Sequence, residues 1–547
     1  MNRTSKRLKK LTAAATASVM LLSGTSSVFA ATYQEAEKAA LSRFVEEFSK
    51  YWDTMVPEQK KAMAGSKGVL TLTLEDSGKT LLSAASGGMD FSWLNTLTMD
   101  MTATISEGKE TANAAVLLND APLCNMNLYM DMADLTEYLQ IPELSETWMK
   151  IPLLASLEMS EEEMAQAFET EEKAQYYAEY MEEYAASLRK LYRILGDMTT
   201  VLPDTATLAA LLDRYGNILI DQTPEGTAIE EALSVEGISE DCTAYETIIT
   251  EADFLNMVKN ILTTAKEDQE LKGLLDQWSE IGGEDLNAQL QAGADGLLAD
   301  IAEEGGSDAA FLSSKIWTDA DGKIAGREIG MSDGTEIIPI FTFKNPSADG
   351  NSALLIEFGA DEEKVTFTGT GKDTDGLLNG DHILAVNGVK MLAVQVENLE
   401  INPEIPEYYN GMIHVSVLDT GTEEEPNPLA AFGLDINLNS DPEAGINQID
   451  LSVTNSGVPL VTLSVSGGYS DTGASLPEQA ALDAALDFTQ EESEITYLES
   501  MNWETLLSNA SAAGVPEELV TILDQIISQS VDSVLNPPED PAMEEAA

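Results

Sequence analysis

Basic residues are scarce in this chain of 547 residues. Lysine and arginine total 29 against 95 aspartates and glutamates, which gives a formal charge of −66. Affinity for nucleic acids depends on clustered lysine and arginine side chains that neutralise phosphates. Docking on an anionic lipid surface depends on the same positive charge. The composition therefore excludes nucleic acid as a partner and disfavours attachment to anionic membranes.

Histidine is rarer still, because the chain contains only His382 and His414. Neither lies in an HExxH motif or a comparable metal-binding spacing, and no nucleophile elbow or phosphate-binding loop is present. His414 falls on the polar side of an alternating strand pattern, which predicts a solvent-exposed histidine. The sequence thus predicts no catalytic residue, no metal site and no cofactor.

Aromatic residues make up only 6% of the chain. A glycosidase would use two converging carboxylates, but among 95 acidic residues some pairs approach each other by chance. A carbohydrate site would also need exposed aromatic side chains. An acid-pair hydrolase is therefore the least favoured function, and we predict that the protein is not an enzyme.

Cysteine is limited to Cys124 and Cys242. If the protein is exported, one disulfide between them is chemically allowed. Cys124 also shares strand parity with Met126 and Leu128, which is typical of a small buried hydrophobic residue. Both interpretations stay open at the level of sequence.

One segment resembles a calcium loop. Acidic residues and a glycine occupy positions 3, 5, 6 and 12 of an EF-hand pattern, namely Asp319, Asp321, Gly322 and Glu328. Position 1 is Trp317, however, and the flanking residues alternate like strands. A hairpin turn explains the same residues without a metal ion, and this is the prediction we make.

The first thirty residues predict export. Five basic residues without an acid precede a short uncharged stretch, and Val28-Phe29-Ala30 places small residues at the −3 and −1 positions. This pattern is typical of a secretory signal peptide cleaved after Ala30. Residues Leu22–Thr25 contain no cysteine for lipid attachment, and no later apolar run is long enough to span a membrane. We expect a secreted, extracellular protein.

Removing the signal peptide makes the charge imbalance larger. The signal peptide contains five basic residues and no acidic ones. Its removal therefore changes the formal charge from −66 to −71. A protein with this much negative charge repels its own copies. We therefore expect a monomer.

The periodicity of apolar residues divides the chain into segments. We predict a signal peptide at 1–30, an N-terminal helix at 31–66, a first group of antiparallel strands at 67–156 and a mainly helical insertion at 157–306. A long antiparallel meander follows at 307–470, then C-terminal helices at 471–536 and an acidic disordered tail at 537–547. Residues 31–536 are predicted to form one composite domain.

The order of these segments predicts the fold class. Runs of strands separated from runs of helices are typical of α+β proteins. We expect a large curved antiparallel sheet, resembling a half-barrel, with helices packed on one face. In detail, the apolar stripe of the N-terminal helix is predicted to close at Pro57, and turns are predicted at Ser77-Gly78 and at recurrent Asp-Gly and Asn-Gly pairs. Ser160 and Glu163 form a capping-box pattern for a long helix.

Methionine is unusually frequent on one side of the early strands. Met99 and Met101 share the apolar parity of their strand, and the same holds for Met126, Leu128, Met130 and Met132. Methionine is flexible and polarisable, and it recurs on surfaces that bind varied apolar partners. These six residues are our candidate ligand-binding site; the alternative is that they fill the core beneath the helices.

One local run is similar to a known superfamily. It begins at Tyr129-Met130-Asp131-Met132, continues through Ile141-Pro142-Glu143-Leu144 and ends at Trp148-Met149-Lys150-Ile151-Pro152. Together with the segment order, this run resembles the LolA/LppX-type bacterial envelope proteins, over residues 67–156 and 309–470. The resemblance implies a curved sheet wrapped over helices and a hydrophobic cavity for lipids or lipoproteins. Many of those proteins carry a lipid-anchoring cysteine that this chain lacks.

The sequence thus favours a secreted, non-catalytic protein of the bacterial envelope or exterior. Its expected partners are a hydrophobic, lipid-like small molecule or an extracellular protein. The alternative is a surface or matrix interaction protein with a filled core and no small-molecule site.

Overall fold

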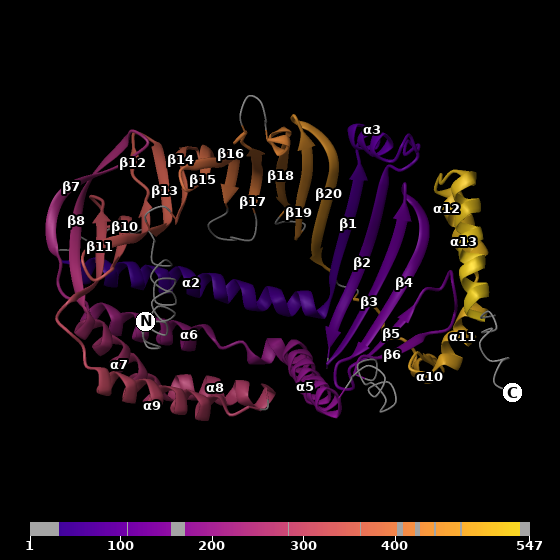
Figure 1. Cartoon of the computed structure of the whole chain (residues 1–547), viewed down its shortest axis with the longest axis horizontal. Coiled ribbons are helices and arrows are strands. Elements are labelled where there is room, and N and C mark those ends of the chain that lie inside the picture. The colour runs from indigo at the N-terminus through magenta and orange to yellow at the C-terminus, as the bar shows by residue number, and fades with distance from the viewer. Residues whose placement is uncertain are drawn as a thin grey trace. The chain divides into compact units, whose positions relative to one another are not determined.

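A computed structural model describes residues 32–535, apart from 107, 155–169, 283, 361–362, 402–408, 422–426, 442–444 and 471–472. It confirms the α+β class, because strands joined in mainly antiparallel ladders alternate with groups of helices (Figure 1). The chain forms two compact units. Unit 1 comprises 1–57, 202–280 and 284–437, and unit 2 comprises 58–201, 281–283 and 438–547.

The strands of unit 1 follow one another as a meander. Each strand pairs with the next in an antiparallel ladder, except that β11 pairs with β13, which also pairs with the short strand β12. They are β7 (Thr227–Val235), β8 (Ile238–Thr250), β9 (Ala310–Thr318), β10 (Ile324–Ser332), β11 (Ile337–Lys344), β12 (Ser347–Ala348), β13 (Asn351–Ala360), β14 (Glu363–Thr374), β15 (Leu377–Val386), β16 (Val389–Ile401) and β17 (Tyr409–Val417). The 3-10 helix η2 (Pro428–Ala431) follows, and β18 (Phe432–Asp441) extends from unit 1 into unit 2.

The predicted Asp-Gly and Asn-Gly turns are confirmed in this meander. Asp375-Gly376 joins β14 to β15, and Asn387-Gly388 joins β15 to β16. All four residues have positive φ, which is the backbone geometry that such two-residue hairpin turns require. The turn chemistry in the sequence therefore placed the strand ends correctly.

Helices of unit 1 include α2 (Tyr33–Ala64), which starts in this unit, α6 (Thr205–Gln222), α7 (Glu251–Glu267), α8 (Gln269–Gly282) and α9 (Leu286–Glu304). Helix α2 continues past Pro57, where its apolar stripe was predicted to close, and ends at Ala64 with Pro57 inside it. Proline removes one backbone donor, but the following residues, such as Gln59, Lys60 and Ala62, have high helix propensity and continue the helix.

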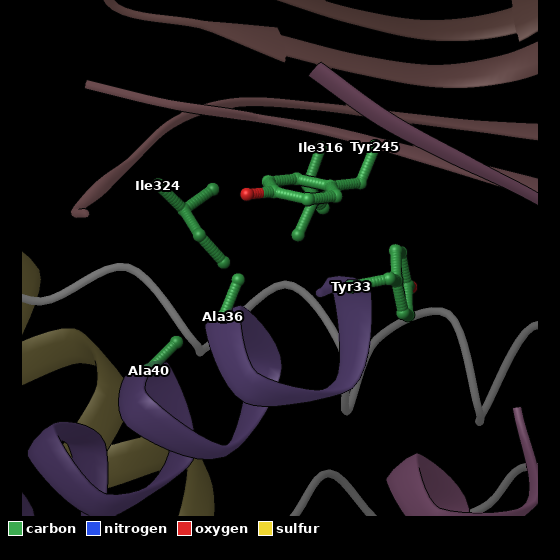
Figure 2. Close-up of a cluster of buried hydrophobic side chains, with 6 residues drawn as sticks. All are labelled: Tyr33, Ala36, Ala40, Tyr245, Ile316 and Ile324. Carbon is green, nitrogen blue, oxygen red and sulfur yellow. The ribbon is translucent and has the colours of Figure 1, made fainter. Parts of the chain in front are cut away.

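The core of unit 1 lies where α2 packs on the meander. Ala36 and Ala40 of α2 face Tyr245, Ile316 and Ile324 of β8, β9 and β10 (Figure 2). Ile316 is completely buried. Small residues on the helix let its backbone approach the sheet closely, so that the larger sheet residues fill the space between them.

A buried ion pair secures the same contact. Arg327 of β10 donates two hydrogen bonds to the Glu37 carboxylate of α2, at 2.6 Å and 2.7 Å. Both side chains are only 5% exposed. The Tyr33 hydroxyl donates to Ser314 Oγ at 2.8 Å, and burial together with the charge of Glu37 raises the pKa of Tyr33. The Glu37 carboxylate and the Tyr33 hydroxyl of α2 are thus both paired inside the core.

Unit 2 joins strands that are far apart in the sequence. The paired order is β19 (Ile446–Asn455), β20 (Val458–Tyr469), β1 (Ser66–Leu74), β2 (Thr96–Ser106), β3 (Lys109–Leu118), β4 (Ala121–Asp131), β5 (Thr136–Gln140), β6 (Met149–Pro152) and β21 (Leu486–Asp487). Only the β6–β21 pair is parallel among these ladders. The β1–β20 pair joins residues 66–74 to residues 461–469, which are far apart in the sequence.

The helices of unit 2 are α3 (Asp76–Ala85), α5 (Glu171–Val201), α10 (Gln479–Asp483), α11 (Glu491–Ser500), α12 (Trp503–Ala512) and α13 (Glu517–Leu535). The predicted turn at Ser77-Gly78 is wrong, since both residues lie in α3. Gly78 is buried in α3, and a β-carbon there would overlap the backbone carbonyl of Leu460. Close helix–sheet packing therefore explains this glycine.

Some predicted features differ from the structure or lie outside its description. The segment 157–306, predicted as mainly helical, also contains strands β7 and β8, and Glu230 and Glu231 interrupt the apolar alternation of β7. The signal peptide, the Ser160–Glu163 capping box and the acidic tail lie outside the described residues. Among the described helices, none combines the length and apolar character needed to cross a membrane.

Candidate binding sites

The predicted methionine site lies on one face of the unit 2 sheet. Directly paired residues share a face, so the registers connect Leu72 to Leu97, and Leu70 to Met99. The same face continues through Met101, Ala114 and Met126 on β2, β3 and β4, and through Leu463 and Val465 on β20. We call this surface the apolar sheet face.

A large part of the apolar sheet face is exposed. Leu72, Leu97 and Val465 are 41%, 41% and 40% exposed, although they occupy adjoining rows on three paired strands. Met99, Met101, Met126 and Leu128 are partly exposed. At β3 the situation changes, since Leu118, the paired neighbour of Leu97, is buried against Ala510, Ala513 and Val515 at the end of α12 and just after it.

The six predicted residues therefore divide into two groups. Met130 and Met132 are buried with Leu135, and Leu188 and Tyr192 of α5 pack against them. These two methionines fill a core, as the alternative interpretation held. The remaining four, at 99, 101, 126 and 128, stay accessible on the apolar sheet face.

The opposite face of the same strands is polar and internally bonded. Thr71 and Thr98 share a hydrogen bond at 3.1 Å. Asn113 donates to Asn127 at 2.8 Å, and Asn127 donates to Gln140 at 2.9 Å. Because the polar side chains of this face bond to one another across the strands, the unit 2 sheet presents its exposed apolar side chains on a single face.

Unit 1 contains a second candidate, a hollow of about 480 Å³ over β14 to β17. Short side chains and longer polar side chains line it. The short ones include Thr368, Thr370, Ala385, Ala393 and Ser416, and the longer ones include Glu236, Asp381, Lys390, Gln395 and His414. Its volume falls within the range of small-ligand sites. Glu236, in the β7–β8 turn, accepts a hydrogen bond from Thr368 at 3.4 Å.

Both histidines are among the residues around this hollow, but the registers place His414 on the face of Thr370 and Gln395, and His382 on the opposite face. His414 Nδ1 lies 2.8 Å from an oxygen of Asp435, and His414 Nε2 lies 3.9 Å from an oxygen of Glu397. The predicted solvent exposure of His414 is too simple, because its side chain is only 28% exposed and lies between two carboxylates. His382 stacks on Phe367 with ring centroids 5.2 Å apart, and burial lowers its pKa.

The hollow offers hydrogen-bonding groups but not a complete catalytic set. The contact of His414 with Asp435 fixes the imidazole ring, which is one requirement of acid–base chemistry. Ser416 lies two positions further along the same strand face, with no hydrogen bond to His414 among those that the structure describes. Alternation of threonine, serine and histidine in β14 to β17 was the signal that could have located the hollow from the sequence.

The cysteines occupy separate strands as free thiols. Cys124 lies on β4 in unit 2 and is half-buried, whereas Cys242 lies on β8 in unit 1 and is buried. The disulfide between them, considered from sequence, is not formed in the structure. Burial, together with the nearby charge of Glu240, raises the pKa of Cys242 to about 12. This thiol is therefore uncharged near neutral pH.

The calcium-like loop forms the predicted hairpin turn between β9 and β10. The Asp319 carboxylate accepts hydrogen bonds from the backbone amides of Asp321 and Lys323, at 2.9 Å and 2.8 Å. Gly322 has a positive φ of 76°, as the turn requires. The acidic residue thus stabilises the turn backbone.

Comparison with known proteins adds no relative. No protein family matches the chain, and neither a curated protein nor a solved structure is found to be similar to it.

Proposed function

We propose that this is an exported, non-catalytic binding protein that holds an apolar, lipid-like ligand on the apolar sheet face of unit 2. The observation that carries the proposal is the exposure of Leu72, Leu97 and Val465, each by about 40%, in adjoining rows of paired strands. Contiguous apolar patches on soluble proteins mark binding sites far more often than isolated exposed residues do.

The chemistry of this face suits a ligand of variable shape. Leu72 and Leu97 provide branched apolar surface, and Met99 and Met101 add flexible thioether side chains beside them. Methionine adapts its conformation to different apolar shapes. A function as an interaction protein with a filled sheet core would bury these residues, so their exposure favours ligand binding.

The charge of the protein limits the ligand further. With a formal charge of −66, the protein repels anionic head groups at low ionic strength. An uncharged long-chain molecule is not repelled, and burial of its apolar surface makes the free energy of binding more favourable. We therefore expect neutral lipids to bind more tightly than fatty-acid anions of equal chain length.

Uptake of the uncharged dye Nile red, with native mass spectrometry of gently purified protein, tests the proposal. Leu97→Asp should weaken dye binding about tenfold, because it places a charge in the apolar contact. Thr98→Asp adds the same charge on the opposite face of the same strand and should change the affinity less than about twofold. A wild-type protein that takes up no dye and carries no bound mass, or equal effects of the two variants, would contradict the proposal.

A further inference from the structure

The long helix α5 of unit 2 exposes a row of aromatic side chains, independently of the apolar sheet face. Tyr176, Tyr180 and Tyr184 are spaced four residues apart, so they lie one above another on one side of the helix. They are 73%, 55% and 42% exposed. We call these three residues the tyrosine stripe.

The stripe is not needed to attach α5 to its unit. Leu188 and Tyr192 continue the same four-residue spacing further along the helix, and it is these two residues that pack on buried Met130 and Met132. The rings of Tyr180 and Tyr184 stack on each other instead, with centroids 6.5 Å apart and an angle of 11° between their planes. Aromatic rings held in this way keep part of their π surface open to solvent.

Carboxylates accompany the tyrosines on the same side of the helix. Glu179 is three residues after Tyr176, and Glu183 is three residues after Tyr180, so each lies beside a ring of the stripe. Both glutamates are exposed. Gln175 donates a hydrogen bond to Glu179 at 3.0 Å, which holds this carboxylate along the helix surface.

We propose that the tyrosine stripe is a docking site for a lysine- or arginine-rich segment of a partner protein. An aromatic face attracts a cation through its quadrupole, and an adjacent carboxylate adds a charge-assisted hydrogen bond. Exposed tyrosines also supply a large contact area at low cost in conformational entropy. A second copy of this chain is a poor occupant, because each copy carries a charge of −66.

The test must separate the stripe from the general attraction of a negative protein for any cation. Binding of labelled oligolysine and oligoarginine peptides is measured by fluorescence anisotropy on the full chain. Changing all three tyrosines to leucine keeps the net charge, the apolar area and the helix propensity, but it removes the rings. We expect the affinity to fall about tenfold or more, whereas Tyr→Phe at the same positions retains the ring faces and should restore the affinity.

Two matched controls complete the design. Tyr51→Leu changes another exposed tyrosine, on α2, and should leave the affinity unchanged. Glu179→Gln with Glu183→Gln should weaken binding several-fold, and more than Glu494→Gln with Glu499→Gln, which removes the same charge from exposed positions of α11. Circular dichroism confirms that each variant remains folded, and the single change Tyr180→Leu replaces the triple variant if that one unfolds.

Three outcomes overturn the proposal. Equal peptide affinity of the wild type and the leucine variant shows that only bulk charge is measured. Equal binding of an uncharged peptide shows that the stripe is a general apolar contact. A wild-type dimer in light scattering that the leucine variant converts to a monomer assigns the stripe to a second copy of the chain.

Discussion

Two faces of antiparallel sheet in this molecule have the same alternation of apolar residues, but only one of them is buried by a helix. In unit 1, Ile316 and Tyr245 are buried beneath α2, which brings Ala36 and Ala40 against them. In unit 2, Leu72 and Leu97 form an equally apolar row that stays about 40% exposed. Period-two alternation predicts that a strand has an apolar face, but not whether that face is covered.

The two units also differ in the burial of their ion pairs. Beneath α2 the Glu37–Arg327 pair is enclosed with two hydrogen bonds. In unit 2 the Lys150–Asp487 pair, at 3.0 Å on the face opposite the apolar sheet face, leaves about a third of each side chain exposed. Loss of one partner should therefore cost more stability in the enclosed pair than in the half-exposed one.

The largest effect should come from breaking the buried ion pair. Glu37→Gln leaves the Arg327 charge enclosed without a carboxylate, which should lower the free energy of unfolding by about 3–5 kcal/mol. Urea denaturation measures the change. Glu46→Gln removes an exposed partner of Lys50 on the same helix and should cause no measurable loss. Equal stability of the wild type and Glu37→Gln would show that α2 is not held by this pair.

Truncating one apolar side chain on each surface compares how much the two surfaces contribute to the free energy of unfolding. Ile316→Ala should cost about 2–5 kcal/mol, because it opens a cavity in a packed core. Leu72→Ala removes a side chain that is 41% exposed and should cost about 1 kcal/mol or less. Thermal and urea unfolding of both variants give the two values. Similar losses at the two positions would mean that the apolar sheet face is covered in solution.

The cysteines provide one probe in each unit. Burial raises the pKa of both thiols, with a smaller contribution from Glu240 at Cys242 and from Glu143 at Cys124. We expect buried Cys242 to react with a thiol reagent much more slowly than half-buried Cys124, measured on Cys124→Ser and Cys242→Ser variants at pH 8. Equal rates in strong denaturant are the control. Fast labelling of Cys242 without denaturant would show that unit 1 opens locally.

The smallest effect concerns His382. Burial lowers the pKa of this imidazole in the folded state, so the unfolded chain takes up a proton first when the pH falls below about 6.5. The contribution of His382 to stability is therefore complete above that pH and is lost as the pH falls toward the folded-state pKa. Paired melting curves of the wild type and His382→Gln at pH 7.5 and 5.5 measure it. A pH dependence that is identical in both proteins would rule this contribution out.

The predictions succeeded where local chemistry decides the structure. Asn387-Gly388 and Asp375-Gly376 were located as turns because few residues adopt positive φ without strain. They failed where packing overrides local preference, as at Gly78, which allows α3 to approach β20. The division of the six candidate residues also depended on packing, since Met130 and Met132 are buried against Leu188 and Tyr192 of α5.

The sequence alone determined the charge of −66, the alternation of the strands and the position of the turns. These are properties of individual residues and their nearest neighbours. Tertiary structure decided that β1 pairs with β20, that Ile316 is buried while Leu72 is exposed, and that His414 lies between Asp435 and Glu397. The physical reason is that a sheet face is covered by segments that are distant in the sequence. Whether they meet depends on the entropy of closing the loop between them and on how well they pack, and neither produces a periodic pattern of residues.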